Sequence, residues 1–143
     1  MTVAKRPGWF IILVSVLIVW GLAGCAAFYA HVAYGPAIDP HATDWDRAYF
    51  AALPGWFTWD YAAAVGAGLL GSIALLARSK VAGPLYILSL VAVVIQFGYV
   101  FFATDMLAHK GAAMTVPFPL FIIAMAVLQV WLAGYARDRN WVS

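Results

Sequence analysis

Five polar side chains could form a binding site if the segments that carry them pack together: His31, Asp60, Gln96, Tyr99 and Asp105. Asp60 is the most informative of them, because an ionisable group inside an apolar segment is costly in a membrane and is a functional candidate by default. Two interpretations of Asp60 stay open. It binds a proton or a cation together with other members of this group, or it lies at the headgroup level and hydrogen-bonds to a Trp, a Tyr or a loop N–H.

Metal and enzyme chemistry are poorly represented in this sequence. His31, His41 and His109 could join carboxylates as metal ligands, but no HxxxH, HxH or HxxE spacing places two ligands on one helix face. The single cysteine, Cys25, excludes an internal disulfide and a cysteine-based metal cluster. There is also no phosphate-binding Gly loop and no nucleophile elbow. We therefore expect no catalytic residues and no bound metal or cofactor.

The composition indicates which solvent surrounds these side chains. Apolar residues of the AVILMFWYC set make up 66% of the 143 residues, and charged residues make up 10%. Soluble domains usually have about 45–50% apolar and about 25% charged residues, so we expect membrane lipid to be the main contact of this chain. The net charge of +2 and the dispersed bases do not indicate a nucleic-acid partner.

Four apolar stretches are long enough to cross a membrane, which takes roughly 20 helical residues. They run from about 9 to 33, 56 to 77, 81 to 103 and 115 to 136. The sequence therefore predicts one all-α transmembrane domain over residues 1–143, an integral membrane four-helix bundle. A short amphipathic helix is predicted at about 43–53, with Thr43 as its N-cap, lying on the outer membrane surface. Aromatic residues near the span ends are expected to anchor the helices at the headgroup level: Trp9, Trp56, Trp59, Tyr135 and Trp141.

Basic residues predict the direction of the spans. Six of the eight Lys and Arg residues fall on one side: Lys5, Arg6, Arg78, Lys80, Arg137 and Arg139. Because basic loops stay in the cytoplasm, we expect a multi-pass protein of the bacterial inner membrane with both termini cytoplasmic. The Leu22-Ala23-Gly24-Cys25 segment resembles a lipoprotein cleavage signal, but the apolar stretch continues beyond it, so we expect an uncleaved first span.

Small residues recur along the second span at intervals that suit close helix packing in lipid. One set is Ala63, Ala67 and Gly71, and the set one position on is Ala64, Gly68 and Ser72. We expect these residues to pack helices within the chain. Contact with another membrane-protein chain, or with a second copy, is the alternative.

Three segments resemble a family of small four-helix bacterial inner-membrane proteins. The first covers residues 54–76 and begins Pro54-Gly55-Trp56, the second is Pro84–Leu90, and the third is Ala136–Ser143. Members of this family often carry the label "sugar transporter". The resemblance implies a membrane location and four spans, and it assigns no functional residue to this chain.

The sequence favours a non-catalytic membrane protein, an accessory or structural subunit of a larger membrane complex. A carrier of small, sugar-like solutes that acts as a dimer is the first alternative. It is less favoured because no predicted span has a charge at its centre and few hydrogen-bonding side chains, among them Gln96 and Gln129, lie along the bundle. A periplasmic-side ligand sensor built around the five polar residues is the second alternative.

Overall fold

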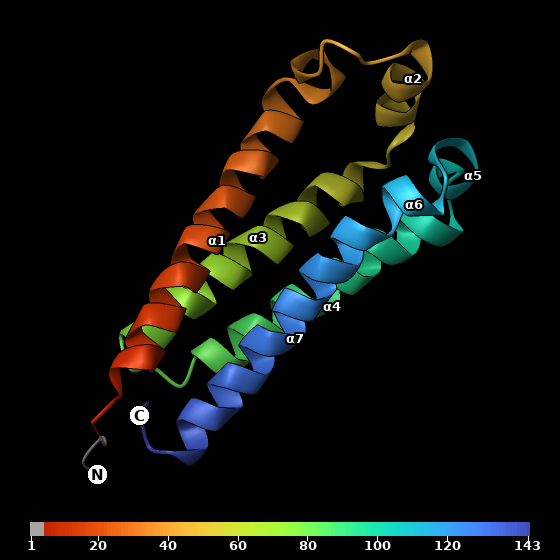
Figure 1. The fold of residues 1–143 in the computed structure, drawn as a ribbon. Coiled ribbons are helices and arrows are strands. Elements are labelled where there is room, and N and C mark those ends of the chain that lie inside the picture. The colour runs from red at the N-terminus through yellow and green to blue at the C-terminus, as the bar shows by residue number, and fades with distance from the viewer. Residues whose placement is uncertain (1–4) are drawn as a thin grey trace.

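Four long helices dominate the computed structural model, which describes residues 5–143. They are α1 (Gly8–Ala33), α3 (Gly55–Leu76), α4 (Ala82–Phe102) and α7 (Pro117–Asp138), and they run side by side in Figure 1. Each is long and apolar enough to cross a membrane. The predicted all-α fold with four spans is confirmed, and the helix bounds agree within the usual uncertainty of helix ends.

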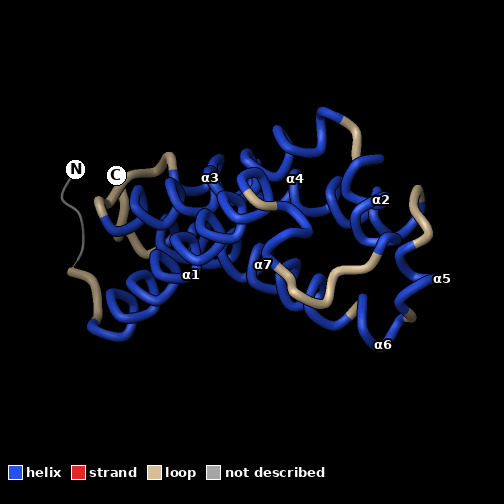
Figure 2. Tube along the Cα trace, turned by 90° about the horizontal axis from the view of Figure 1, so that it is seen from above, coloured by secondary structure: helices blue, strands red, loops and turns tan. Residues whose placement is uncertain are grey.

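Shorter helices form the two connections at one end of the bundle. The first contains the 3-10 helix η1 (Gly35–Ile38) and α2 (Asp44–Ala52), and the second contains α5 (Met106–Lys110) and α6 (Ala112–Thr115). Figures 1 and 2 place α2, α5 and α6 opposite the two chain termini. We call this end, with residues 34–54 and 103–116, the loop end. The opposite end, with residues 5–7, 77–81 and 139–143, is the basic end.

Helix α2 forms where the sequence predicts it, because its first turn is capped twice. The Asp46 N–H donates to Thr43 Oγ1 at 3.3 Å, and the Thr43 N–H donates to Asp46 Oδ2 at 2.8 Å. This reciprocal capping box satisfies two backbone donors that the helix itself leaves free. Helices α5 and α6 were not predicted.

Helices α3 and α4 approach closely at Gly71. A Cβ atom at Gly71 would lie 2.7 Å from Cδ1 of Tyr86, whose side chain is fully buried. The Tyr86 hydroxyl shares a 2.6 Å hydrogen bond with Ser72 Oγ, and Ser89 Oγ donates to the Ala64 carbonyl at 2.7 Å. The small residues of the second span therefore make room for polar groups that bind each other inside the bundle.

The other predicted packing residues of α3 lie on the same side of the helix. Ala64, Ala67 and Gly68 are buried, and Ala63 is partly buried against the cluster formed by Ala64, Ala92 and Val93. All six packing residues thus contact neighbours within this chain.

Helix α1 packs on α3 through glycines that the sequence analysis did not single out. A Cβ at Gly21 would lie 3.0 Å from Cα of Leu69, and a Cβ at Gly24 would lie 3.3 Å from Cγ1 of Val65. Figure 1 shows α3 between α1 and α7. No Cα atom of α1 lies within 8 Å of a Cα atom of α7, so these two helices are held apart over their length.

Helices α3 and α7 end in the same motif, with a residue in the left-handed conformation. Arg78 has φ 63° and Asn140 has φ 60°. The Ser79 N–H returns to the Ala74 carbonyl at 2.8 Å, and the Trp141 N–H returns to the Ala136 carbonyl at 2.9 Å. This is the Schellman arrangement, which reverses the chain after a helix. After α7, the reversal carries the next residues back into the bundle.

The returning segment closes the basic end. Trp141 is only 7% exposed, and its ring lies 4.7 Å from that of Phe10 and 5.4 Å from that of Tyr135. The Ser143 N–H donates to the Arg78 carbonyl at 2.9 Å, and the Lys80 N–H donates to the Ser143 carbonyl at 3.3 Å. Trp141 is therefore part of the core, which differs from the expected anchor at the headgroup level.

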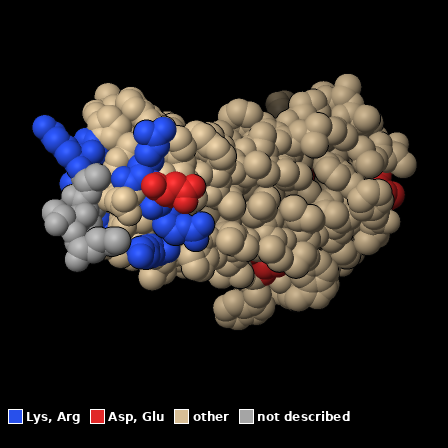
Figure 3. Space-filling model, turned by 90° about the horizontal axis from the view of Figure 1, so that it is seen from below, with Lys and Arg blue, Asp and Glu red and all other residues tan. Residues whose placement is uncertain are grey.

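Positive charge gathers around this closed end. Figure 3 shows Lys and Arg side chains concentrated at one end of the visible face, while the long middle part carries almost none. Arg6 Nη1 donates to the carbonyls of Leu75 and Leu76 at 3.2 and 2.8 Å, in the last turn of α3, where carbonyls lack their usual partners within the helix. A cation there also suits the negative end of the helix dipole.

Candidate functional site

The five predicted polar residues do not bind one another, although His31 and Tyr99 both pack against the ring of Phe57. Among the described residues, no hydrogen bond or ion pair joins any two of the five. His31 lies among rings, with centroids 5.0 Å from Phe50 and 5.2 Å from Tyr61. Tyr99 packs edge-on against Trp56 with ring centroids 5.1 Å apart.

The remaining members lie in three different settings. Asp105 is exposed at the start of α5. Gln96 lies deeper, in the groove described below. Asp60 is partly buried, and its Oδ2 atom is buried with no hydrogen-bond partner among the described residues. None of the partners expected for Asp60 forms a hydrogen bond with it among the described residues, so both interpretations of Asp60 stay predictions.

Instead, aromatic and charged side chains join α2 to α5 at the loop end. The rings of Trp45 and His109 are stacked, with centroids 3.9 Å apart and an interplanar angle of 4°. The Tyr49 ring also stacks on Trp45, with the ring centroids 5.1 Å apart, and the Tyr49 hydroxyl lies 3.3 Å from Thr104 Oγ1. We call the unit formed by α2 and α5 the cap.

An ion pair fastens the cap. Lys110 Nζ lies 2.7 Å from Asp46 Oδ1 and 5.4 Å from the ring centroid of Trp45. Asp46 therefore binds its own helix through Oδ2 and the neighbouring helix through Oδ1. The Lys110 ammonium, with the Thr43 N–H, lowers the pKa of the Asp46 carboxyl to about 2 from its usual 3.8.

Acid is therefore expected to release α2 from α5. A carboxyl whose pKa is lowered on folding favours the folded arrangement above pH 3.8, and that contribution is lost as the pH falls through about 2. Spin labels at Ala51 and Ala108, in a Cys25→Ser chain, should give a narrow distance distribution at about pH 5 and a broad one at about pH 2.

The matched variants separate the ion pair from general acid effects. Asp46→Asn should give the broad distribution at both pH values. Asp44→Asn should keep the narrow one at the higher pH, because Asp44 pairs within α2, with Arg47 at 2.6 Å. Equal behaviour of the two variants would show that Lys110 does not hold the cap.

A groove separates α1 from α7 in the middle of the bundle. It encloses about 360 Å³ and draws residues from all four long helices, including Trp20, Gly24, Tyr61, Gln96, Phe118 and Gln129. The rings of Trp20 and Phe121, 5.5 Å apart, bridge α1 and α7 beside it. Ala23, Ala27 and Phe118 are exposed, so the groove opens between the two helices at a depth within the spans.

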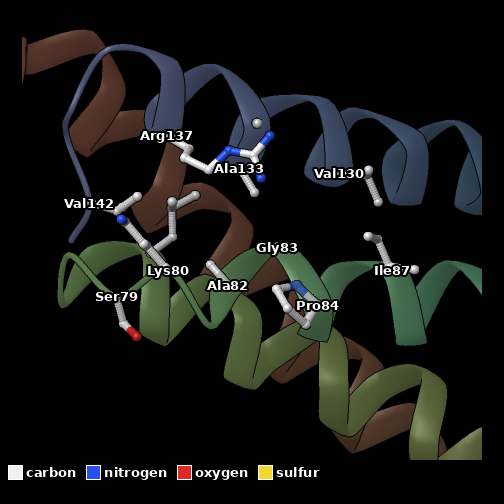
Figure 4. Close-up of a pocket in the computed structure, with 12 residues that line it drawn as sticks. Ser79, Lys80, Ala82, Gly83, Pro84, Ile87, Val130, Ala133, Arg137 and Val142 are labelled. Atoms are coloured by element: carbon white, nitrogen blue, oxygen red, sulfur yellow. The ribbon is translucent and has the colours of Figure 1, made fainter.

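A second, smaller cavity lies at the basic end. It measures about 160 Å³, and Figure 4 shows it between α7 and the start of α4, with Arg137 and Lys80 at its edge. Apart from Ser79, its other lining residues, such as Pro84 and Ala133, are apolar. Its volume is below the roughly 300 Å³ at which small-molecule sites begin, so the groove is the better candidate for a ligand.

No family model, curated protein or solved structure matches this chain. The four spans and the geometry of the cap and groove therefore have to support any function by themselves. The described residues also contain no group of three or more His, Cys, Asp or Glu side chains placed to hold a metal ion.

Two features of these sites were missed from the sequence. The sequence names Gln96 and Gln129 among the few hydrogen-bonding side chains of the bundle, but it does not predict that these residues of two different helices share a groove. The pairing of Trp45 with His109 joins two loops that are separated by the whole of α3 and α4. Both are contacts between distant segments, for which a single sequence offers no spacing signal.

Proposed function

We propose that this protein is a non-catalytic accessory subunit of a larger complex in the bacterial inner membrane, and that the cap contacts its partner. The supporting observation is that the first connection is long and has a regular structure of its own. Helices α1 and α3 pack side by side, and adjacent helices are usually joined by about 2–8 residues. Here residues 34–54 connect them, with two helices of their own. Long ordered connections of this kind are usually functional.

The rigidity of the cap supports a role in recognition. The Trp45–His109 stack and the Asp46–Lys110 pair hold residues of both connections in one arrangement. A partner that binds such a surface does not have to order it first, and binding then costs less conformational entropy. Aromatic residues such as Trp and Tyr are also enriched where proteins bind each other.

The proposed direction puts the cap in the periplasm. Arg47 and Lys110 are the only Lys or Arg residues of the described chain at the loop end. The excess of Lys and Arg at the basic end therefore favours a cytoplasmic location for that end and for both termini. The partner would accordingly present a periplasmic surface.

Site-specific photo-crosslinking in the native host tests this proposal. A benzophenone side chain at Ala51, exposed on α2, should give one discrete crosslinked product containing a second membrane-protein chain. The same probe at Val19, exposed on α1, should give no such product, because lipid covers that face. Asp46→Asn should weaken the Ala51 crosslink and Asp44→Asn should not. Equal crosslinking from Ala51 and Val19 would contradict a role of the cap.

A carrier of sugar-like solutes, acting as a dimer, is the second candidate. The two glutamine amides of the groove favour it, since amides can bind sugar hydroxyls. Phe10, Leu17 and Leu132 are fully buried between the groove and the basic end, so a solute has no open path there. The carrier would require sugar uptake into proteoliposomes that is abolished by Asp60→Asn or Gln96→Ala. The accessory subunit requires no effect of Asp60→Asn.

A further inference from the structure

Two buried amides face the groove without a partner. Gln129 is 3% exposed and Gln96 is 9% exposed, and both line the groove. Neither side chain forms a hydrogen bond with any described residue. Each amide can donate two hydrogen bonds and accept two through its oxygen. A polar group that is buried in hydrocarbon without a partner costs several kcal/mol, so this groove is energetically suited to a molecule that pairs with the amides.

The position of the groove defines how such a molecule reaches it. On α1 the lining runs from Trp20, at the middle of Gly8–Ala33, toward the loop end as far as Ala27, and on α7 it begins at Phe118, the second residue of the helix. The opening between α1 and α7 therefore faces the hydrocarbon core. The basic end is closed by the core around Trp141. A molecule that enters through this opening has to be soluble in lipid.

The walls define the chemistry of the molecule. Trp20, Tyr61, Phe97 and Phe118 supply aromatic rings, and no Lys, Arg, His, Asp or Glu lines the groove in the part of the chain that is described. A charged head has no counter-charge there, and a sugar would leave most of its hydroxyls facing apolar walls. An uncharged apolar molecule with a few oxygen atoms meets both requirements.

The spacing of the amides adds a further constraint. Gln96 and Gln129 lie on neighbouring antiparallel helices, at levels that differ by about five residues, or roughly 8 Å along the bundle at 1.5 Å per residue. Ser89 lies near the level of Gln129, and Tyr61 near that of Gln96. The groove therefore offers polar contacts at two levels with apolar walls between them.

We propose that the groove between α1 and α7 is a binding site for a neutral, lipid-soluble small molecule whose carbonyl or hydroxyl oxygens bind the amides of Gln96 and Gln129. This site is separate from the cap and goes beyond an accessory role. The oxygens could belong to a quinone-like ring, which carries two carbonyls, or to a long-chain alcohol or glyceride, which carries hydroxyls. Both kinds of oxygen can form hydrogen bonds with the amides of the groove.

Binding of three radiolabelled probes to the full chain in nanodiscs tests the proposal. The probes are decyl-1,4-benzoquinone, the alcohol dodecane-1,2-diol and decylbenzene, which has no oxygen, and protein-free nanodiscs correct for partition into lipid. At least one oxygen-bearing probe should bind about tenfold more tightly than decylbenzene, because two hydrogen bonds in a membrane contribute together about 1.4 kcal/mol. A preference for the quinone or for the alcohol identifies the source of the oxygens.

Variants separate recognition by the amides from simple filling of a groove. In the double variant Gln96→Leu with Gln129→Leu, the ratio of the affinity for the oxygen-bearing probe to that for decylbenzene should fall to about one. Ser15→Ala, at an exposed polar position of α1, should leave this ratio unchanged. The double variant without a probe should unfold at a higher temperature than the unsubstituted chain, because two unpaired amides are gone. Ala23→Trp, at the opening, should block all three probes while both amides stay.

The opposite results would overturn the proposal. They are equal binding of decylbenzene and the oxygen-bearing probes, no binding of any probe, or a lower unfolding temperature of the double Leu variant, which would show that the amides are already paired. A second copy seated in the groove would also overturn it, and would appear as a stable dimer in nanodiscs that excludes the probes. None of these results affects the Ala51 crosslink, so this proposal and the role of the cap fail independently.

Discussion

Trp141→Ala is expected to lower the free energy of unfolding by about 3 kcal/mol, at the lower end of the range for removing a buried Trp. The ring fills the space between Phe10, Tyr135 and the fully buried Leu132. Its removal leaves a cavity at the end of the bundle, where the neighbouring side chains belong to two different helices, α1 and α7, and cannot all collapse into it. Unfolding in mixed micelles, followed by circular dichroism, measures the loss.

Trp59→Ala is the matched control for this prediction. Trp59 is 78% exposed on α3, and removing an exposed ring should change the unfolding free energy by no more than about 0.5 kcal/mol. If the two variants lost the same stability, Trp141 would have to lie outside the bundle, and the closure of the basic end would be wrong.

Gly71→Leu is expected to cost about 3 kcal/mol, the upper part of the range for overpacking a core. Even the first carbon of the new side chain would lie 2.7 Å from the Tyr86 ring. That ring cannot move aside easily, since it is fully buried and its hydroxyl is bound to Ser72. Helices α3 and α4 would have to separate, and unfolding in mixed micelles would register the change.

Two further variants define the cause of this loss. Gly66→Leu is the control on the same helix, because a Cβ at Gly66 meets nothing within 4 Å and the side chain can extend freely. Tyr86→Ala makes room for the new Leu, so the double variant Gly71→Leu with Tyr86→Ala should lose less than the sum of the two single losses. Strict additivity would indicate that Gly71 and Tyr86 are not in contact.

The four spans were predictable because hydrocarbon imposes a simple requirement. A helix that crosses it needs about 20 apolar residues, and that requirement is local in the sequence. The N-terminal capping of α2 by Thr43 was predictable for the same reason, since Thr43 and Asp46 lie three residues apart and bind each other. The close contact at Gly71 was predictable from the spacing of small residues along one helix.

The sites were less predictable because they are built between segments. Depth along the spans suggested that His31 and Asp60 share a cluster, but depth does not say which side of a helix a residue occupies. His31 lies among the rings of Phe50 and Tyr61 instead. Gln96 and Gln129 meet in one groove because α4 and α7 are neighbours, which follows from the packing of the whole bundle.

Helix α5 shows why short helices are difficult to predict from the sequence. Met106–Lys110 has five residues, too few to form a stable helix in isolation. It is held in place by the contacts of His109 and Lys110 with α2. Its structure is therefore a consequence of tertiary contacts that the local sequence does not encode.

The attachment of residues 141–143 to the Arg78–Lys80 turn affects the order in which parts of the bundle can pack during synthesis. Phe10 enters the bilayer early in translation, yet the Trp141 ring that covers it leaves the ribosome only after α7 has been synthesised. Insertion of the first three spans therefore yields an intermediate that is open at the basic end. Closure of this end has to wait until residues 141–143 have emerged, and a chaperone or quality-control protease has that interval in which to recognise the open intermediate.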